Sequence, residues 1–302
     1  MKKILIIGGS NIDYIGKSDH KLNNKDSNIG SISISFGGVA RNICENLARL
    51  KCQPTFVTAV GNDMLAQTLL QELKDLNVKV INPDSRDYKT GGYLAIHGCD
   101  GDMALALCDQ RIIDLISIDY LKTLEHKFLE ADIIVTDANL NQDVVEYIIN
   151  NYRDKIVVCD AISVSKVKKL ENVIDKISLL KCNLLEAKSL LNKDLEPYEL
   201  AQEFIKRNAK TVVITNSDKE VIYVEDKKVK TSRVFKVNEK DIVNLTGVGD
   251  AMLSGIIYAL ANDLTIEEAI RLGKEASIIT LKSSKATSPE IYKLIEKKEL
   301  KH

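Results

Sequence analysis

The strongest constraint on the fold is the alternation of two kinds of segment along the chain. Short runs rich in Ile and Val recur at Ile4–Ile7, Thr55–Val60, Asp132–Thr136, Ile156–Cys159, Ser178–Lys181 and Thr211–Thr215. Runs that are apolar throughout predict strands buried on both faces. Segments with apolar residues at helical spacing lie between or after them: Ala40–Leu50, Ala66–Leu76, Gln142–Tyr152, Glu186–Leu191, Glu199–Asn208, Asp250–Ala261, Ile266–Leu281 and Pro289–Leu300. This order predicts a doubly wound α/β fold, in which helices flank a mostly parallel sheet.

Two stretches do not fit this alternation. Residues 12–36 are polar and end in the alternating segment Ile32–Phe36, and residues 90–107 contain two short strand-like runs, Tyr93–Ile96 and Met103–Leu107, around a turn. Together they predict a small inserted antiparallel sheet, placed as a lid over the carboxyl ends of the main strands. A functionless edge hairpin is the alternative. We expect residues 1–302 to form one domain with this lid inserted.

The charge balance excludes several classes of partner. The chain has 42 Lys and Arg against 43 Asp and Glu, a formal charge of −1, which gives no basic footprint for nucleic acid or an anionic membrane. No apolar run approaches the roughly 18 residues of a membrane helix. The cysteines form no C-x-x-C pair, which is typical of reduced core thiols. We therefore expect a soluble cytoplasmic protein.

Glycine is scarce, which draws attention to where it occurs. Of 15 glycines none lies between residues 102 and 246, and this gap ends in the motif Asn244-Leu245-Thr246-Gly247-Val248-Gly249-Asp250. Two closely spaced glycines before a helix let successive backbone N–H groups point one way, which makes an anion hole for a phosphate. Asp250 would then face the bound anion as a general base. The alternative is a simple glycine turn with Asp250 as the helix N-cap.

Three further polar motifs sit at strand ends or helix starts. The pair Gly37-Gly38, with Asn42 in the following helix, suits close backbone approach to a ligand with hydroxyl groups. Asn11 and Asp13 follow the first strand, where open α/β sheets bind ligands. Each of these could equally be an ordinary turn, helix start or solvated loop.

The third of these motifs is Asn183-Leu184-Leu185-Glu186. Asn-x-x-Glu is close to a capping box, a helix-start motif with no catalytic role. The functional alternative is a polar pair that positions hydrated Mg²⁺ near phosphates.

Taken in this order, the motifs N-x-D, G-G-x-x-x-N, N-x-x-E and T-G-x-G-D resemble the ribokinase-like (phosphofructokinase-B, PfkB) family of carbohydrate and nucleoside kinases over essentially the whole chain. Within that family the sequence is most similar to the bacterial pseudouridine kinases. The similar stretches are Asp26–Gly30, Gly37–Asn46, Asp137–Leu140, Cys159–Ser163 and Asn244–Thr246.

The resemblance implies an ATP-dependent, Mg²⁺-requiring kinase acting on a 5′-hydroxyl, and it leaves potassium near Asn244 open. Asp250 would accept the hydroxyl proton, and the amides of residues 247–250 would stabilise the transferring phosphoryl group. The residues expected to hold the sugar are Asn11, Asp13, Gly37, Gly38, Asn42 and Asn139. Those expected at the nucleotide are Asn183, Thr215, Thr246, Gly247, Gly249, Ala276 and Ser277. Asn183 and Glu186 would order Mg²⁺, mainly through water.

The sequence departs from the family pattern in the turn after Thr215, where Asn216–Glu220 has no glycine. Without glycine, Asn or Asp is expected to supply any left-handed residue there. Two alternatives remain open: a kinase for another nucleoside or ribose, and a catalytically silent ligand-binding protein on the same fold. The alternating lid strands would expose one apolar face, so we also expect a homodimer through the lid.

Overall fold

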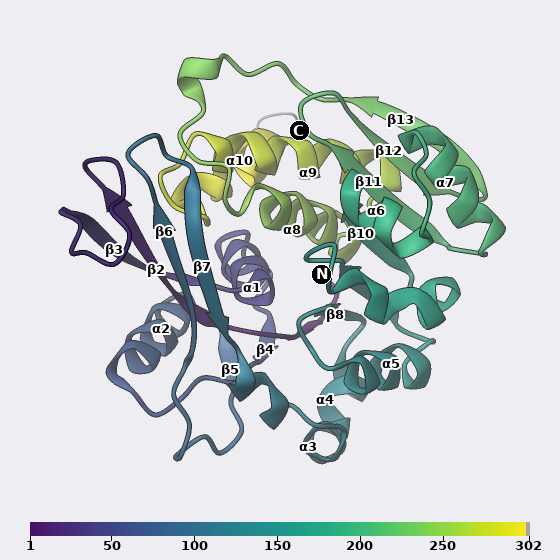
Figure 1. The fold of residues 1–302 in the computed structure, drawn as a ribbon. Coiled ribbons are helices and arrows are strands. Elements are labelled where there is room, and N and C mark those ends of the chain that lie inside the picture. Colours follow the sequence, from purple (N-terminus) through teal and green to yellow (C-terminus); the bar gives the residue numbers. More distant parts are fainter. Residues whose placement is uncertain (300–302) are drawn as a thin grey trace.

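The computed structural model describes residues 1–299 and contains a nine-stranded sheet in the order β13-β12-β11-β10-β9-β8-β1-β4-β5 (Figure 1). The strands from β11 to β5 are parallel, and β12 and β13 extend one edge as an antiparallel hairpin. The strand bounds are β1 (Ile4–Ile7), β4 (Thr55–Val57), β5 (Lys79–Ile81), β8 (Ile133–Asp137), β9 (Ile156–Asp160), β10 (Leu179–Asn183), β11 (Thr211–Asn216), β12 (Glu220–Glu225) and β13 (Lys228–Arg233). The mostly parallel sheet is confirmed.

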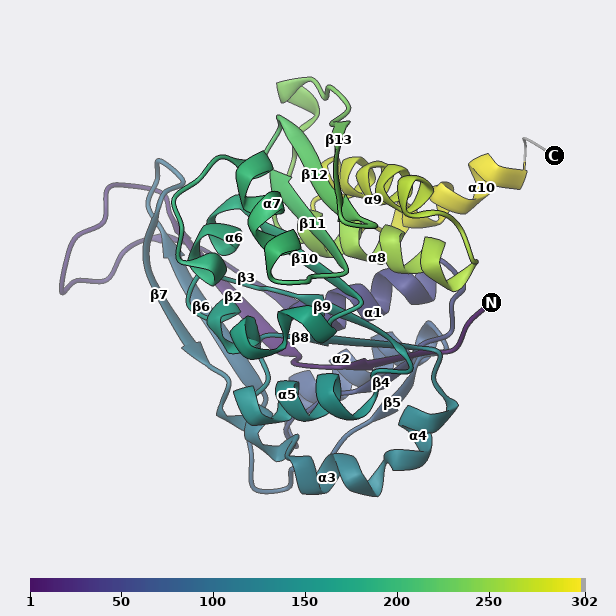
Figure 2. The same cartoon turned by 90° about the vertical axis from the view of Figure 1, so that its right-hand side faces the viewer.

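Helices cover both faces of this sheet (Figures 1 and 2). One face packs against α1 (Val39–Arg49), α2 (Met64–Asp75), α8 (Val248–Ala261) and α9 (Ile266–Leu281). The other packs against α3 (Ile118–Thr123), α4 (Glu125–Glu130), α5 (Gln142–Asn151), the 3-10 segment η2 (Val167–Lys176), α6 (Leu184–Leu191) and α7 (Pro197–Lys206). In β1 the side chains of Leu5 and Ile7 enter one core, and those of Ile4 and Ile6 enter the other. This alternation explains why the strand is apolar throughout.

The ends of some elements differ from the sequence predictions. The strand predicted over Thr55–Val60 ends at Val57, opposite Ile81, where the neighbouring strand β5 also ends. The helix predicted over Pro289–Leu300 is a 3-10 turn, η4 (Pro289–Tyr292), followed by α10 (Lys293–Glu299), and Leu300 lies outside the described residues. The remaining 3-10 turns are η1 (Arg111–Leu115) and η3 (Glu239–Asp241).

A second, four-stranded sheet, called the small sheet below, stands beside the main one with the order β3-β2-β6-β7 (Figure 2). Its strands are β2 (Asn11–Ser18), β3 (Gly30–Gly37), β6 (Gly91–His97) and β7 (Met103–Asp109). The prediction of a purely antiparallel sheet is wrong in one respect, since β2 and β6 pair in parallel. Both strands follow parallel strands of the main sheet, β1 and β5, and so leave it in the same direction. In the described part of the chain, no helix is long and apolar enough to span a bilayer.

Candidate active site

The start of α8 has the geometry expected of an anion hole. Gly247 is the N-cap with a left-handed φ of 78°, and a Cβ there would collide with the carbonyl oxygen of Ala286. Val248 begins the helix, and Asp250 is its third residue rather than its N-cap. The N-cap alternative for Asp250 is therefore wrong. The first backbone N–H groups of a helix have no partner within the helix, so they are free to face an anion.

Asp250 is buried and reaches across to helix α1. Its Oδ2 accepts a hydrogen bond of 2.8 Å from Asn42 Nδ2, which brings together two residues 208 positions apart. Burial raises the pKa of Asp250 from 3.8 to about 7, and the neighbouring Asp160 carboxylate adds to this, while Lys181 and Asn42 oppose it. A carboxylate that titrates near neutral pH is well matched to accepting a hydroxyl proton.

Lys181 and Asp160 complete this buried cluster, and the motif analysis gave neither of them a role. Lys181 Nζ lies 3.0 Å from Asp160 Oδ2, and both side chains are buried. A Cβ on Gly249 would come within 2.7 Å of Lys181 Nζ, so the ammonium group lies against the anion hole. Burial lowers the pKa of Lys181, but Asp160 and Asp250 outweigh it and raise the pKa overall, which keeps the side chain charged. In the sequence Asp160 follows the apolar run Ile156–Cys159 and Lys181 ends the run Ser178–Lys181, and those positions were the available signal. In the structure Asp160 ends β9, whereas Lys181 lies inside β10.

The predicted sugar-binding residues gather where β1 ends and α1 begins. Asn11 Nδ2 donates to Asp13 Oδ1, and Gly37 packs so closely on Asp13 that a Cβ would overlap its carboxylate. A Cβ on Gly38, whose φ is 103°, would collide with the carbonyl oxygen of Gly9 and come within 3.1 Å of Asn11 Oδ1. Burial raises the pKa of Asp13 to about 6, while Arg41 and Asn11 lower it. The structure thus places two carboxylates, Asp13 and Asp250, beside the same helix start.

Asn139 lies at the carboxyl end of β8, where its side-chain Oδ1 accepts a 2.5 Å hydrogen bond from Lys166. Its backbone amide donates to Oδ1 of the neighbouring Asp137. The other oxygen of Asp137 is buried and has no hydrogen-bond partner among residues 1–299. Burial raises the pKa of Asp137 to about 6. Asp137 pairs in register with Asp160 on β9 and adds a third carboxyl group to the cluster.

Asn183 and Glu186 form the capping box that was the alternative interpretation of this motif. The Asn183 side chain accepts from the Glu186 amide at 2.9 Å, and the Glu186 carboxylate accepts from both the backbone N–H and the side-chain amide of Asn183. Among the described residues no group of three or more His, Cys, Asp and Glu could hold a metal directly. The carboxylate and amide oxygens of the pair are of the kind that Mg²⁺ binds, directly or through water.

The predicted nucleotide residues lie near the same edge of the sheet. Thr215 pairs in register with Asn183 on the neighbouring strand. Ser277 Oγ donates to the carbonyl oxygen of Val248 at 3.2 Å, which joins α9 to the start of α8, and Ala276 beside it is fully buried. Thr246 is exposed, and its amide donates to Asn244 Oδ1.

The glycine-free turn after Thr215 differs from the prediction. Its left-handed residue is Ser217, with φ 51°, and not Asn216 or Asp218. The turn closes an antiparallel hairpin in which Asn216 pairs with Glu220, so the ladder fixes both ends. The left-handed position falls on the first of the three residues between them.

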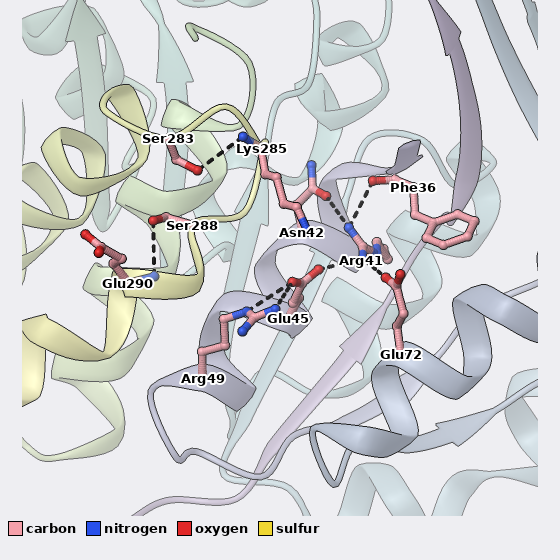
Figure 3. A network of polar contacts seen from close by, with 10 residues as sticks. All are labelled: Phe36, Arg41, Asn42, Glu45, Arg49, Glu72, Ser283, Lys285, Ser288 and Glu290. Carbon is pink, nitrogen blue, oxygen red and sulfur yellow. Dashed lines mark hydrogen bonds and ion pairs between the residues drawn. The ribbon is translucent and has the colours of Figure 1, made fainter. Parts of the chain in front are cut away.

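A cleft of about 810 Å³ opens between the small sheet, helices α1 and α2, and the loops that precede α8 and follow α9. Its lining includes Asp13, Phe36, Arg41, Asn244 and Thr246. Arg41, another residue without a predicted role, is almost fully buried next to Asn42 (Figure 3). The cleft therefore joins Asp13, one of the predicted sugar-binding residues, to the loop that leads into the anion hole.

Comparisons with a family model, with curated proteins and with solved structures all lead to sugar and nucleoside kinases. Residues 1–292 match the model of the pfkB family carbohydrate kinases. The pseudouridine kinase of Escherichia coli (strain K12) is 30% identical, over 95% of this chain and 93% of that protein, and the guanosine-inosine kinase of Exiguobacterium acetylicum is 28% identical over 96% and 98%. The ribokinase of Thermotoga maritima, 22% identical, superimposes over 100% of both chains with a TM-score of 0.86, which shows the fold.

Proposed function

Because the chain belongs to the PfkB family of carbohydrate kinases and is an ATP-dependent phosphotransferase acting on sugars or nucleosides, we propose that it phosphorylates the 5′-hydroxyl of pseudouridine. The observation that carries the proposal is the buried Asp250, held by Asn42 at the start of α8, next to the amides of an anion hole. The choice of pseudouridine rests on the similarity to the E. coli pseudouridine kinase along nearly the whole chain.

In this mechanism Asp250 accepts the proton of the 5′-hydroxyl as its oxygen attacks the γ-phosphorus of ATP. The backbone N–H groups of residues 247–250 face the transferring group and stabilise the charge on its oxygens. Lys181, against Gly249, adds a fixed positive charge at the same place. Because Asp160 pairs with Lys181, the lysine stays in position while the charge on Asp250 changes during proton transfer.

The ribose would lie over the helix start, where Asp13 can accept hydrogen bonds from two adjacent hydroxyls. Asn11 holds the Asp13 carboxylate from one side, and the absence of a side chain at Gly37 leaves room for that carboxylate. Asn42 would bridge the sugar and Asp250, and Asn139 would face the sugar from β8. The small sheet would close over the base as a lid on the single domain.

ATP would lie along the carboxyl edge of β10 and β11, bordered by Asn183, Thr215, Thr246, Ala276 and Ser277. Glu186, together with Asn183, would hold Mg²⁺ through water, and the metal would supply charge neutralisation between the phosphates. Potassium near the Asn244 loop remains part of the proposal. That loop is fixed to the segment after α9 by the bond from Asn244 Nδ2 to the Ser284 carbonyl oxygen at 3.4 Å.

The second candidate is a kinase for a purine nucleoside or free ribose. It is favoured by the guanosine-inosine kinase, which is only slightly less similar and covers as much of the chain. The third alternative, a silent ligand-binding protein, has less support because relatives that cover the whole chain are named as kinases.

A substrate panel with ADP release as the readout distinguishes these candidates. We expect pseudouridine to have the highest kcat/KM, and uridine to be poorer by about 100-fold or more if the site bonds the extra ring N–H of pseudouridine. Phosphorus NMR of the product should show a 5′-monoester, and Asp250→Asn is the matched negative control. Faster turnover of inosine, guanosine or ribose than of pseudouridine would overturn the choice of substrate.

We also propose that two copies associate through the apolar face of the small sheet. The exposed side chains on this face are Ile32, Ile34, Leu94, Leu105 and Leu107. The register places Ile34, Leu94 and Leu107 in one row across the sheet, with Tyr14 of β2 between the first two. Ile32 is 79% exposed and Leu107 61%, so a second copy of the sheet could bury a contiguous apolar patch.

A further inference from the structure

The orientation of the Asn42 amide decides whether a hydrogen-bond donor or an acceptor faces the Asp250 carboxylate. An Asn side chain carries a donor and an acceptor of nearly identical shape, and only hydrogen-bonding partners determine which way it faces. Here Nδ2 faces Asp250 Oδ2 at 2.8 Å, and Oδ1 faces Arg41 Nη1 at 3.2 Å. A guanidinium group donates hydrogen bonds and accepts none. With Arg41 in place, the amide can therefore face Asp250 only with its donor.

Arg41 is itself fixed by groups from three elements (Figure 3). Its Nη1 donates to the carbonyl oxygen of Phe36 in β3 at 2.9 Å, and its Nη2 forms an ion pair of 2.5 Å with Glu45 one turn along α1. Glu72 of α2 lies 3.5 Å from the same nitrogen, at the exposed edge of the network. Glu45 also accepts two hydrogen bonds from Arg49. Arg41 and Glu45 are both at least 94% buried, so the pair has little freedom to rearrange.

We propose that Arg41 is a positioning residue that locks the Asn42 amide with its donor toward Asp250, so that Asn42 stabilises the ionised base and gives no acceptor to the protonated one. This inference rests on the proposed function of Asp250 as the base. Without Arg41 the amide can turn over, and its oxygen can then accept a hydrogen bond from protonated Asp250. The protonated form is stabilised in that case, so the base becomes harder to ionise.

The direction of the effect depends on every charged group that faces Asp250. Lys181 on β10 favours its ionised form, and Asp160 on β9 and Asp137 on β8 disfavour it. None of these is changed by replacing Arg41. If the hydrogen bond that Asn42 Nδ2 donates to ionised Asp250 is lost, the pKa of Asp250 should rise by about one unit. Since that pKa is about 7 in the intact protein, the ionised fraction at neutral pH would fall roughly fivefold.

The test compares two substitutions that differ in one chemical property. Arg41→Lys keeps a side chain that only donates, whereas Arg41→Gln introduces one that can also accept. We expect the acidic limb of kcat/KM against pH to move up by about one unit in Arg41→Gln and to move much less in Arg41→Lys. Glu72→Gln is the control, because it removes only the outer ion pair and should leave the profile unchanged. A purely structural role would lower stability in both Arg41 variants without moving the limb.

A double-mutant cycle tests whether Arg41 acts through Asn42. In an Asn42→Ala background, Arg41→Gln should lower kcat/KM little further, and additive losses would overturn the proposal. Should Arg41→Gln fail to fold because buried Glu45 keeps its charge with only Arg49 as its partner, Arg41→Gln combined with Glu45→Gln removes that charge and serves in its place.

A measurement without substrate separates this proposal from the proposed function. Carbon NMR titration of the Asp250 carboxyl in the unliganded protein should show the same upward shift in Arg41→Gln. The titration also gives separate signals for Asp250 and Asp13. This matters because the charge of Arg41 lowers the pKa of Asp13 directly, so the substitution shifts that residue too. An unchanged pKa of Asp250 in Arg41→Gln would refute the proposal that Arg41 orients the Asn42 amide. Absence of nucleoside phosphorylation by the intact protein would refute the function and leave the titration result standing.

Discussion

Replacing Asp250 by Asn tests the base and its environment in one experiment. The substituted amide keeps the shape of the side chain and an oxygen to accept the Asn42 hydrogen bond, and it removes the charge. We expect kcat to fall by about 10²- to 10⁴-fold, because a positioned base contributes a factor of that size. The dissociation constants of ATP and nucleoside, measured by calorimetry, should change by no more than about threefold, since the contacts that bind them remain.

The same variant should be more stable than the intact protein, and the gain should depend on pH. Folding raises the pKa of Asp250 from 3.8 to about 7, so the folded state binds this proton more tightly than the unfolded state does. The ionised carboxylate therefore destabilises the fold increasingly as pH rises from about 4 to about 7, and the penalty is constant above that. Three pKa units at 1.36 kcal/mol each give an upper limit of about 4 kcal/mol. Since Lys181 loses a partner in the variant, we expect a net gain of about 2 kcal/mol.

Thermal and urea unfolding at about pH 5 and about pH 8 measure this difference. At the higher pH the free energy of unfolding should exceed that of the intact protein by about 2 kcal/mol, and the gap should narrow at the lower pH. Asp143→Asn is a matched control, because Asp143 also lies in the first turn of a helix but is exposed, and neither turnover nor stability should respond. Near-normal kcat in Asp250→Asn would refute the base assignment. A stability gain equal at both pH values would refute the conclusion that burial raises the pKa of Asp250.

Three further predictions follow from the site and the small sheet. Lys181→Met should lower kcat by about tenfold or more with a smaller change in the KM of the nucleoside, because it removes a fixed charge at the anion hole, and steady-state kinetics check this. Glu186→Gln should raise the Mg²⁺ concentration needed for half-maximal rate, while the capping bond that the backbone amide of residue 186 donates to the Asn183 side chain persists. A Mg²⁺ titration of the rate measures this, and an unchanged midpoint would contradict the metal role. Leu107→Asp should convert a dimer to a monomer in light scattering at micromolar concentration, with unchanged turnover per chain, whereas an intact protein that is already monomeric would rule out the association.

The main sheet could be predicted because its strands are apolar on both faces. Apart from Lys181 in β10, charged residues of the parallel strands stand only at strand ends. The helices between the strands carry a clear 3.6-residue period. The hairpin of β12 and β13 was not predicted, because its turn has no glycine. Asp226 and Lys227 hold φ values of 50° and 59°, a two-residue turn with both positions left-handed that is usually built from Asn-Gly. The hairpin turn is therefore present, but its residue types do not predict it.

The residues of the candidate site also divide into two groups: those in glycine-containing motifs could be predicted from the sequence, and the buried charged ones could not. Glycines before helices stand out in a chain that has few of them, so the anion hole and the Gly37-Gly38 start of α1 could be predicted. Lys181 and Asp160 could not, because a charge at the end of an apolar strand looks like the beginning of a loop. Arg41 resembles any exposed helix cation in sequence. Only its burial against Glu45 shows that it belongs to the interior.

The buried cluster itself explains why the base titrates near neutral pH. The ammonium group of Lys181 forms its ion pair with Asp160, and its charge offsets only part of the rise in the pKa of Asp250. Burial raises the pKa of Asp137 to about 6 and that of Asp250 to about 7, and the negative charge of Asp160 adds to the rise in each. A cluster with this charge cannot attract a polyphosphate by itself. Productive binding of ATP must therefore draw on the helix amides, on Lys181 and on a divalent cation, which is the physical reason to expect a strict Mg²⁺ requirement.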